Sequence, residues 1–138
     1  MSQENVELVR AAYEAWNRGD MSALREAYDS GVVLRMVEGW PEPGPYFGRE
    51  AVMRQWQQQR ETWDADALVP ISDFIDAGDR VVVRFIWRGA GYGPGADLEL
   101  TNVLMLRMGK VVYQEFFWHH TEALEAVGLS EQDAHTDS

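Results

Sequence analysis

Hydrophobic residues in the first half of the chain recur at the spacing of helices. Apolar positions three and four residues apart predict one helix that begins near Ser2 and ends at Gly19, and another over residues 49–63. Between them, Asp20 caps a predicted short helix, and a strand follows over residues 32–38. The residues predicted to face inward from these helices are Val6, Val9, Tyr13, Trp16, Leu24, Ala27, Tyr28, Val52, Trp56 and Trp63. The first half therefore supplies helices that each have one apolar face.

The second half alternates between apolar and polar residues, which is the spacing of strands. The predicted strands cover residues 68–76, 80–88, 98–107 and 111–119. Turns at 77–79 and 108–110 are too short to join parallel strands, so they predict antiparallel neighbours. Residues 89–95 form a glycine-rich connection, and a last helix is predicted over residues 121–127. The second half is therefore mostly an antiparallel sheet.

The order of these elements predicts the α+β fold class, with helices segregated on one face of a bent sheet. Residues 39–48 contain three prolines and three glycines, which favour a loop over a helix or strand. No repeat or linker divides the chain. We therefore expect one domain over residues 1–129 and a polar tail over residues 130–138.

Charge and composition limit the classes of binding partner that we expect. The chain has 138 residues and a net charge of −11, from 23 acidic and 12 basic residues. Such a surface is repelled by phosphate backbones and anionic lipid, so we expect neither nucleic-acid nor membrane binding. The absence of cysteine excludes disulfides, thiolate nucleophiles and cysteine-bound metals. The N-terminus lacks the pattern of a signal peptide, which predicts a cytoplasmic protein.

Several stretches of the sequence resemble one known family. They are residues 12–20 (AYEAWNRGD), 40–44 (WPEPG), 46–52 (YFGREAV), 76–82 (DAGDRVV) and 122–129 (EALEAVGL). On these motifs the chain resembles a SnoaL-like domain of the nuclear transport factor 2-like superfamily, which also contains ketosteroid isomerase, limonene epoxide hydrolase and polyketide cyclases. Because this fold hosts both catalysts and binders, the resemblance indicates the fold more strongly than the chemistry.

The resemblance implies a cone-shaped α+β barrel. In such a barrel, three N-terminal helices close a strongly curved, mostly antiparallel sheet around a hydrophobic pocket, and a short C-terminal helix follows. It also implies a homodimer formed through the outer face of the sheet. If the alternation of side chains holds, that face is supplied by Val103, Met105, Phe116 and Trp118.

Two polar residues are the leading candidates for pocket chemistry. Asn102 interrupts a face made otherwise of leucines, so its amide needs a hydrogen-bond partner or serves as a donor to a developing oxyanion. Glu115 shares a strand face with Tyr113, Phe117 and His119. A carboxylate between aromatic rings is costly to bury ionised, which suits a general acid or base, but a structural ion pair with a nearby arginine is the alternative.

Weaker candidates follow. His119 is a partner for Glu115 or a surface residue, and Glu38 and Tyr13 lie near the acid and the oxyanion-hole tyrosine that the resemblance to ketosteroid isomerase implies. The epoxide hydrolase alternative is less favoured, because Gly95 stands where its motif has arginine. The histidines are not arranged as a ligand cluster, so no metal is expected, and no cofactor is required.

The remaining candidates would line a ligand pocket. They are Trp16, Trp40, Trp56, Trp87, Phe117 and Tyr113. Trp40 lies in the proline-rich loop, as a lid or as a loop anchor. The hypothesis is that the domain binds a small, mostly apolar, carbonyl-bearing molecule and moves a proton on it, as an isomerase or cyclase does. The alternatives are a non-catalytic binder and an accessory domain whose pocket is filled by its own tryptophans.

Overall fold

The structure is a computed structural model, and it describes residues 2–40, 42–63, 67–71, 73–88 and 97–129. The predicted glycine-rich connection, the polar tail and His135 lie outside the described residues. The helices are α1 (Ser2–Asn17), α2 (Met21–Glu26), α3 (Arg49–Trp63) and α4 (His120–Ala126). The strands are β1 (Tyr28–Arg35), β2 (Tyr46–Phe47), β3 (Ala67–Pro70), β4 (Ile75–Ala77), β5 (Arg80–Arg88), β6 (Leu98–Arg107) and β7 (Lys110–Phe117).

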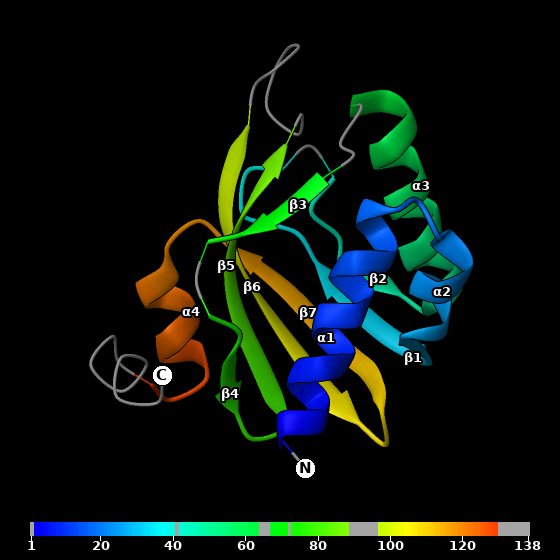
Figure 1. The fold of residues 1–138 in the computed structure, drawn as a ribbon. Coiled ribbons are helices and arrows are strands. Elements are labelled where there is room, and N and C mark those ends of the chain that lie inside the picture. The colour runs from blue at the N-terminus through cyan, green and yellow to red at the C-terminus, as the bar shows by residue number, and fades with distance from the viewer. Residues whose placement is uncertain (1, 41, 64–66, 72, 89–96, 130–138) are drawn as a thin grey trace.

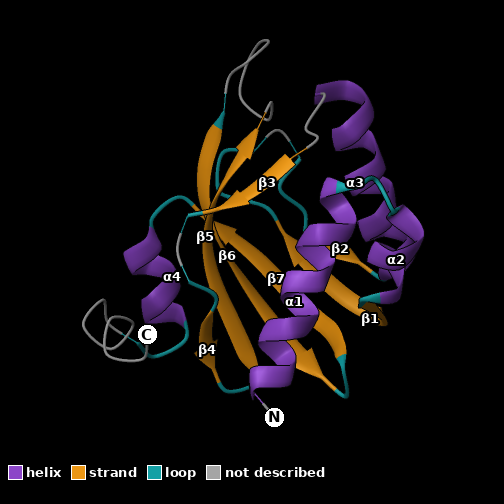
Figure 2. Cartoon of the chain, in the orientation of Figure 1, coloured by secondary structure: helices purple, strands orange, loops and turns teal. Residues whose placement is uncertain are grey.

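The predicted α+β class is confirmed. Helices α1, α2 and α3 cover one side of a curved sheet, and α4 lies on the other side (Figure 1). The strand order is β2-β1-β7-β6-β5-β3, with β4 also paired to β5. The pairing is antiparallel except between β1 and β7, which run parallel. The sheet is curved but not closed, so the cup is formed by the sheet together with its helices (Figure 2).

The strands differ from the sequence prediction at several points, and β1 ends at Arg35, three residues before the predicted end. Strand β1 begins at Tyr28, because β7 pairs with it from there, so Tyr28 is a strand residue rather than a helical one. The strand predicted over residues 68–76 is two strands that pair with opposite ends of β5. Pro70 is the last residue of the first of them, and the N–H of Ile71 makes one more bond to the carbonyl of Arg84 over 2.9 Å. Within the proline-rich loop, Tyr46 and Phe47 add a short edge strand to β1.

The faces of β6 follow the predicted alternation. Leu100, Leu104 and Leu106 are buried in the main core between the sheet and the first three helices. Asn102 shares this inner face and is 2% exposed. Val103 is buried on the outer face, where it packs with residues of α4 such as Leu124. The sheet therefore has a large inner core and a smaller outer one.

The faces of β7 are the reverse of the prediction. Phe116 is buried in the main core, whereas Glu115 pairs with Val103 on the outer face. The cause is a β-bulge, because Leu106 pairs with Val111 and Met105 with Tyr113, which leaves Val112 extra. One extra residue moves every later side chain to the opposite face. The predictions that Glu115 faces the cavity and that Phe116 faces outward are therefore wrong.

The homodimer stays a prediction, but its residues need revision because Phe116 and Val103 are buried within the chain. Of the four residues expected to form its surface, Trp118 is the one with a large exposed fraction, at 43%. Among the described helices, none combines the length and the apolar character that crossing a bilayer requires.

Candidate functional site

A cavity lies in the main core between the inner face of the sheet and the first three helices. Its apolar wall is formed by Ala12, Trp16, Leu24, Trp56, Leu68, Phe85, Trp87, Leu104 and Phe116, and its polar groups belong to Tyr13, Tyr28, Asn102 and Gln114. The polar residues come from four different elements: α1, β1, β6 and β7. The curvature of the sheet therefore brings together groups that are far apart in the sequence.

Aromatic side chains fill much of this space. The cavity has a volume of about 30 Å³, which is room for about two water molecules. The rings of Trp16, Trp56 and Trp87 meet edge to face, with centroids 5.8–5.9 Å apart. Trp40 stacks parallel on Trp87 at 6.1 Å. A ring-sized molecule can enter only if one of these indoles moves.

A chain of four hydrogen bonds crosses the polar side of the cavity. The indole N–H of Trp56 donates to the hydroxyl oxygen of Tyr28 over 3.0 Å, and that hydroxyl donates to Oε1 of Gln114 over 2.7 Å. Nε2 of Gln114 donates to Oδ1 of Asn102 over 3.3 Å, and Nδ2 of Asn102 donates to the hydroxyl oxygen of Tyr13 over 3.0 Å. All five side chains are at most 5% exposed. The four bonds therefore run in one direction, from α3 to α1.

This direction leaves one hydrogen without use. Asn102 donates to the oxygen of Tyr13, and the hydroxyl hydrogen of Tyr13 has no acceptor among the described residues. An indole N–H can only donate, so Trp56 fixes one end of the chain as a donor. Reversing both amides would transfer the unused hydrogen to Tyr28, which also lines the cavity. In either orientation the cavity holds one phenolic hydrogen that a ligand oxygen can accept.

Burial keeps both phenols protonated. Removal from water raises the pKa of Tyr13 and of Tyr28 far above the ordinary tyrosine value, because the phenolate cannot be solvated in the core. Hydrogen bonds from Asn102 and Trp56 oppose this effect but are weaker than it. Tyr13 is therefore a neutral donor at any physiological pH.

Two further donors in the wall lack partners. The indole nitrogens of Trp16 and Trp87 are buried, and neither has an acceptor among the residues that the structure describes. These two side chains are 3% and 1% exposed. A buried N–H without an acceptor costs about 1–3 kcal/mol. The described part of the cavity therefore has more donors than acceptors to receive them.

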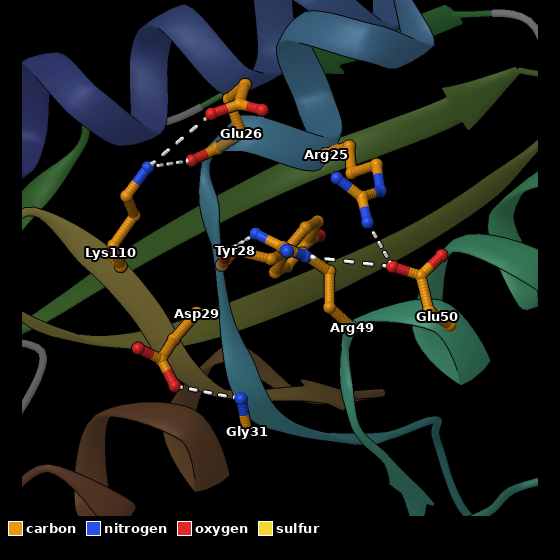
Figure 3. A network of polar contacts seen from close by, with 8 residues as sticks. All are labelled: Arg25, Glu26, Tyr28, Asp29, Gly31, Arg49, Glu50 and Lys110. Atoms are coloured by element: carbon orange, nitrogen blue, oxygen red, sulfur yellow. Dashed lines mark hydrogen bonds and ion pairs between the residues drawn. The ribbon is translucent and has the colours of Figure 1, made fainter.

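Contacts outside the cavity fix the position of Tyr28 at the start of β1 (Figure 3). Nη1 of Arg49 donates to the backbone carbonyl of Tyr28 over 3.4 Å. Lys110 donates to the backbone carbonyl of Glu26, which ties the end of α2 to β7. Arg25 pairs with Glu50 of α3. These contacts hold Tyr28, the second member of the hydrogen-bond chain, in position beside β7.

The structure brings together one set of the predicted site residues. Tyr13, Asn102, Trp16, Trp56 and Trp87 all line the cavity. The signal that found them was their place on an apolar face, at helical spacing or on β6. Trp40 is half-buried and covers Trp87 from the loop side instead of lining the cavity.

A second set lies on the outer side of the sheet. The hydroxyl of Tyr113 donates to Glu115 over 2.6 Å. Burial and this carboxylate raise the pKa of Tyr113 to about 12. Arg35 of β1 is paired in register with Glu115 and also interacts with Tyr113. Phe117 lies on this outer side as well, packed toward α4.

His119 and Glu38 lie apart from the cavity. His119 is exposed where α4 begins, and its side chain makes no capping hydrogen bond. Glu38 is also exposed, and its backbone carbonyl accepts from the indole of Trp118 over 2.8 Å. Neither residue is among those that line the cavity. Among the described residues, no group of three or more acidic, histidine or cysteine side chains is placed to hold a metal ion.

Two polar residues of the cavity were not among the site residues predicted from the sequence. Gln114 was hidden by the bulge, which reverses the alternation of β7. Tyr28 was assigned to the end of a helix, although its inward position was predicted. Gln114 shares its face with Phe116 and pairs with Leu104, and an amide on such an apolar face is the signal that could have identified it once the bulge was recognised.

Comparison with known proteins adds the family. A family model described as a SnoaL-like domain matches residues 9–114. The chain belongs to the SnoaL-like domain family. No curated protein matches this chain.

Solved structures with the same fold include three informative relatives of the SnoaL-like domain. A nuclear transport factor 2-like protein of unknown function from Burkholderia pseudomallei is 25% identical, with a TM-score of 0.74 over 91% of this chain and 98% of that one. TerC, co-crystallized with polyporic acid, is 22% identical, with a TM-score of 0.73 over 90% and 98%. A candidate polyketide cyclase from Sinorhizobium meliloti is 23% identical, with a TM-score of 0.67 over 80% and 93%. These TM-scores show that the three proteins share the fold of this chain.

Proposed function

We propose that this SnoaL-like domain binds a small, mostly apolar ring molecule in its central cavity, and that the hydroxyl of Tyr13 donates to a carbonyl oxygen of that molecule. The observation that carries the proposal is the hydrogen-bond chain that ends at Tyr13 with an unused hydrogen. A donor that is already held in place loses little freedom when the ligand arrives. The aromatic wall supplies the apolar contact that a ring compound needs.

The cavity favours binding over proton transfer. Among the described residues that line it there is no aspartate, glutamate, histidine or lysine, so none of them is suited to act as a general base at neutral pH. The carboxylate expected for that role, Glu115, lies on the outer face of β7. Tyr13 and Asn102 can polarise a carbonyl, but polarisation alone leaves the proton on the ligand. A non-catalytic binder is therefore the function that the geometry supports best.

Entry of a ligand requires the cavity to widen, and Trp40 is the side chain that we propose moves. It is half-buried, stacks on Trp87 from a loop, and follows Gly39, whose φ of +88° is a conformation that glycine adopts without strain. Among the relatives, TerC was co-crystallized with polyporic acid, which supports ligand binding in a protein of this fold. Because the wall of the cavity is mostly aromatic, ring compounds are the first ligand class to test.

Titration with 1-tetralone, a two-ring ketone, tests this proposal. We expect saturable binding by ligand-observed NMR, and a loss of affinity of about tenfold in Tyr13→Phe, because that variant removes one hydrogen bond to the ketone. Two matched controls are Tyr46→Phe, whose hydroxyl donates to the carbonyl of Glu42 outside the cavity, and Glu115→Gln on the outer face. Both controls should bind within twofold of the unsubstituted chain.

Three outcomes would contradict the proposal. The first is an absence of binding at millimolar ketone together with a native mass spectrum free of any copurified molecule. The second is an equal loss of affinity in Tyr13→Phe and Tyr46→Phe. The third is hydrogen–deuterium exchange at the carbon beside the carbonyl that the protein accelerates and that Glu115→Gln abolishes, which would establish proton transfer by that carboxylate.

A further inference from the structure

A second hollow lies on the surface of the domain, where residues of β1, β2 and α3 meet. Its volume is about 290 Å³, which is close to the lower end of the range for small-molecule sites. The side chains that give it chemical character are Ser30 of β1, Phe47 of β2, and Arg49, Glu50 and Arg54 of α3. No described residue lines both this hollow and the central cavity, so the two are separate.

The basic side chains of this surface hollow have hydrogen-bond donors that are not in use. Arg54 is exposed, and its guanidinium makes no hydrogen bond or ion pair with any residue that the structure describes. Nε of Arg49 is buried without a hydrogen-bond acceptor among those residues, although it lies 3.9 Å from Oε2 of Glu50. A guanidinium presents its N–H groups as a planar fork that fits the oxygens of a phosphate or carboxylate. The two arginines therefore offer donors that an anion can use.

The charge around the surface hollow is opposite in sign to that of the whole chain. Arg25 and Arg49 both contact the carboxylate of Glu50 (Figure 3), and Arg54 adds a third positive charge. Asp29 is not among the lining residues, and its carboxylate accepts from a neighbouring backbone N–H over 2.9 Å. Three arginines and one glutamate leave a local charge of +2, in a chain whose net charge is −11. Because an acidic surface repels anions, this local excess is where an anion can approach.

Phe47 supplies the apolar side of the surface hollow. Its side chain is 70% exposed, compared with 43% for Trp118. The pairing of Phe47 with Val33 of β1 fixes its backbone beside the arginines of α3. An exposed ring gains free energy when a flat apolar group covers it. The hollow therefore combines a basic side with an aromatic one.

We propose that this surface hollow is a second binding site, which takes a small aromatic phosphate. The phosphate accepts from Arg49 and Arg54 and from the hydroxyl of Ser30, and the aromatic ring packs on Phe47. A phosphate monoester carries about −1.5 to −2 charges at neutral pH, which matches the local charge better than the single charge of a carboxylate does. The site goes beyond the proposed function, because it is separate from the central cavity and its ligand is an anion.

Titration with phenyl phosphate, followed in ¹H–¹⁵N spectra, tests this inference. We expect saturable shifts of the backbone amides of Gly48 and Ala51, which line the surface hollow, and no shift of the side-chain amide of Asn102 in the central cavity. Benzoate lacks the second charge, and inorganic phosphate lacks the ring. Each should bind at least fivefold more weakly than phenyl phosphate, and sodium chloride should weaken all three because exposed charges are screened by salt.

Variants of exposed residues separate the two sides of the site. Arg54→Gln should weaken the binding of phenyl phosphate about tenfold, because it removes charge-assisted hydrogen bonds. The matched control is Arg18→Gln, which removes the same charge from an exposed arginine that pairs with Asp20 outside the surface hollow. This control should bind within twofold of the unsubstituted chain. Phe47→Leu should weaken phenyl phosphate about threefold and leave inorganic phosphate unchanged.

Three results would overturn the inference. The first is the absence of saturable shifts at Gly48 and Ala51 with millimolar phenyl phosphate. The second is an equal loss of affinity in Arg54→Gln and Arg18→Gln, which would mean that only the total charge of the chain matters. The third is inorganic phosphate that binds as tightly as phenyl phosphate, which would exclude recognition of the ring. Binding of 1-tetralone in the central cavity is measured separately, so either proposal can fail while the other stands.

Discussion

The two faces of the sheet hold polar groups of different character. On the inner face, Tyr13, Asn102 and Gln114 form a neutral hydrogen-bonded chain that is almost fully buried. On the outer face, Glu115 and Tyr113 form a half-buried pair beside Arg35. Neighbouring residues of one strand, Gln114 and Glu115, supply the two faces. The difference shows that register, more than residue type, decides which chemistry reaches the cavity.

Phe116→Glu should break this comparison most severely. It puts a carboxylate on the inner face of β7, where Phe116 is 5% exposed and its ring packs on Trp56 and Trp87. Burying an unpaired carboxylate and losing a core aromatic each cost several kcal/mol, which is comparable to the whole stability of a domain of this size. We expect the variant to lack the cooperative unfolding transition of the folded chain in circular dichroism.

The matched control is Phe117→Glu, which puts the same carboxylate one residue further along β7, on the outer side where Phe117 is only partly buried. It should unfold cooperatively, with a loss of about 1 kcal/mol. A Phe116→Glu variant as stable as Phe117→Glu would show that register does not decide which side chains reach the core.

Truncation of Asn102 should have the next largest effect. Asn102→Ala removes the central link of the buried chain and leaves Nε2 of Gln114 without its acceptor and Tyr13 without its donor. We expect a loss of about 2–3 kcal/mol in urea unfolding, since an unsatisfied buried donor carries most of its desolvation penalty. Glu115→Gln on the outer face should cost less than about 1 kcal/mol. Equal losses in the two variants would refute the distinction between the faces.

Alkaline pH should have a smaller effect, which comes from Tyr13 and Tyr28 on the inner face and, up to about pH 12, also from Tyr113 on the outer face. The pKa of Tyr13 and of Tyr28 is raised in the folded chain, so the unfolded chain loses these protons first. Their contribution to stability is present below the ordinary tyrosine pKa and is lost as the pH rises above it. The free energy of unfolding should fall by roughly 1.4 kcal/mol per pH unit for each of these tyrosines.

Phenylalanine variants measure each contribution to this alkaline slope. Tyr13→Phe should reduce the slope of the unfolding free energy against pH by about 1.4 kcal/mol per pH unit. Tyr46→Phe should reduce this slope little, because Tyr46 is only partly buried. Urea titrations at successive pH values give the slope. A Tyr13→Phe variant with an unchanged slope would mean that this phenol ionises normally in the folded chain.

Most of the fold was predictable because its signals are local. Periodicity located α1, α3, β5 and β6, and the leucine face of β6 placed Asn102 correctly. The same periodicity placed Tyr13, Trp16 and Trp56 toward the cavity. These predictions succeed because each depends on spacing within one element, and the hydrophobic effect enforces that spacing directly.

The errors arise where pairing between distant strands overrides local pattern. The bulge at Val112 is set by the pairing of β7 with β6, and the sequence of β7 alone does not show that this strand has an extra residue. Tyr28 enters β1 because β7 pairs with it from across the chain. The hydrogen-bond chain joins five side chains from five elements, so neither its direction nor its unused hydrogen could be derived before those elements were placed.

The parallel stack of Trp40 on Trp87 has an optical consequence. Trp87 contacts Trp16, Trp56 and Trp40, so these four indoles are close enough to exchange the energy of an absorbed photon, whereas Trp118 is 43% exposed and bonds to Glu38. Displacing Trp40 detaches one chromophore from the group. Under the proposed movement of Trp40, time-resolved emission would follow the opening of the cavity without any added dye.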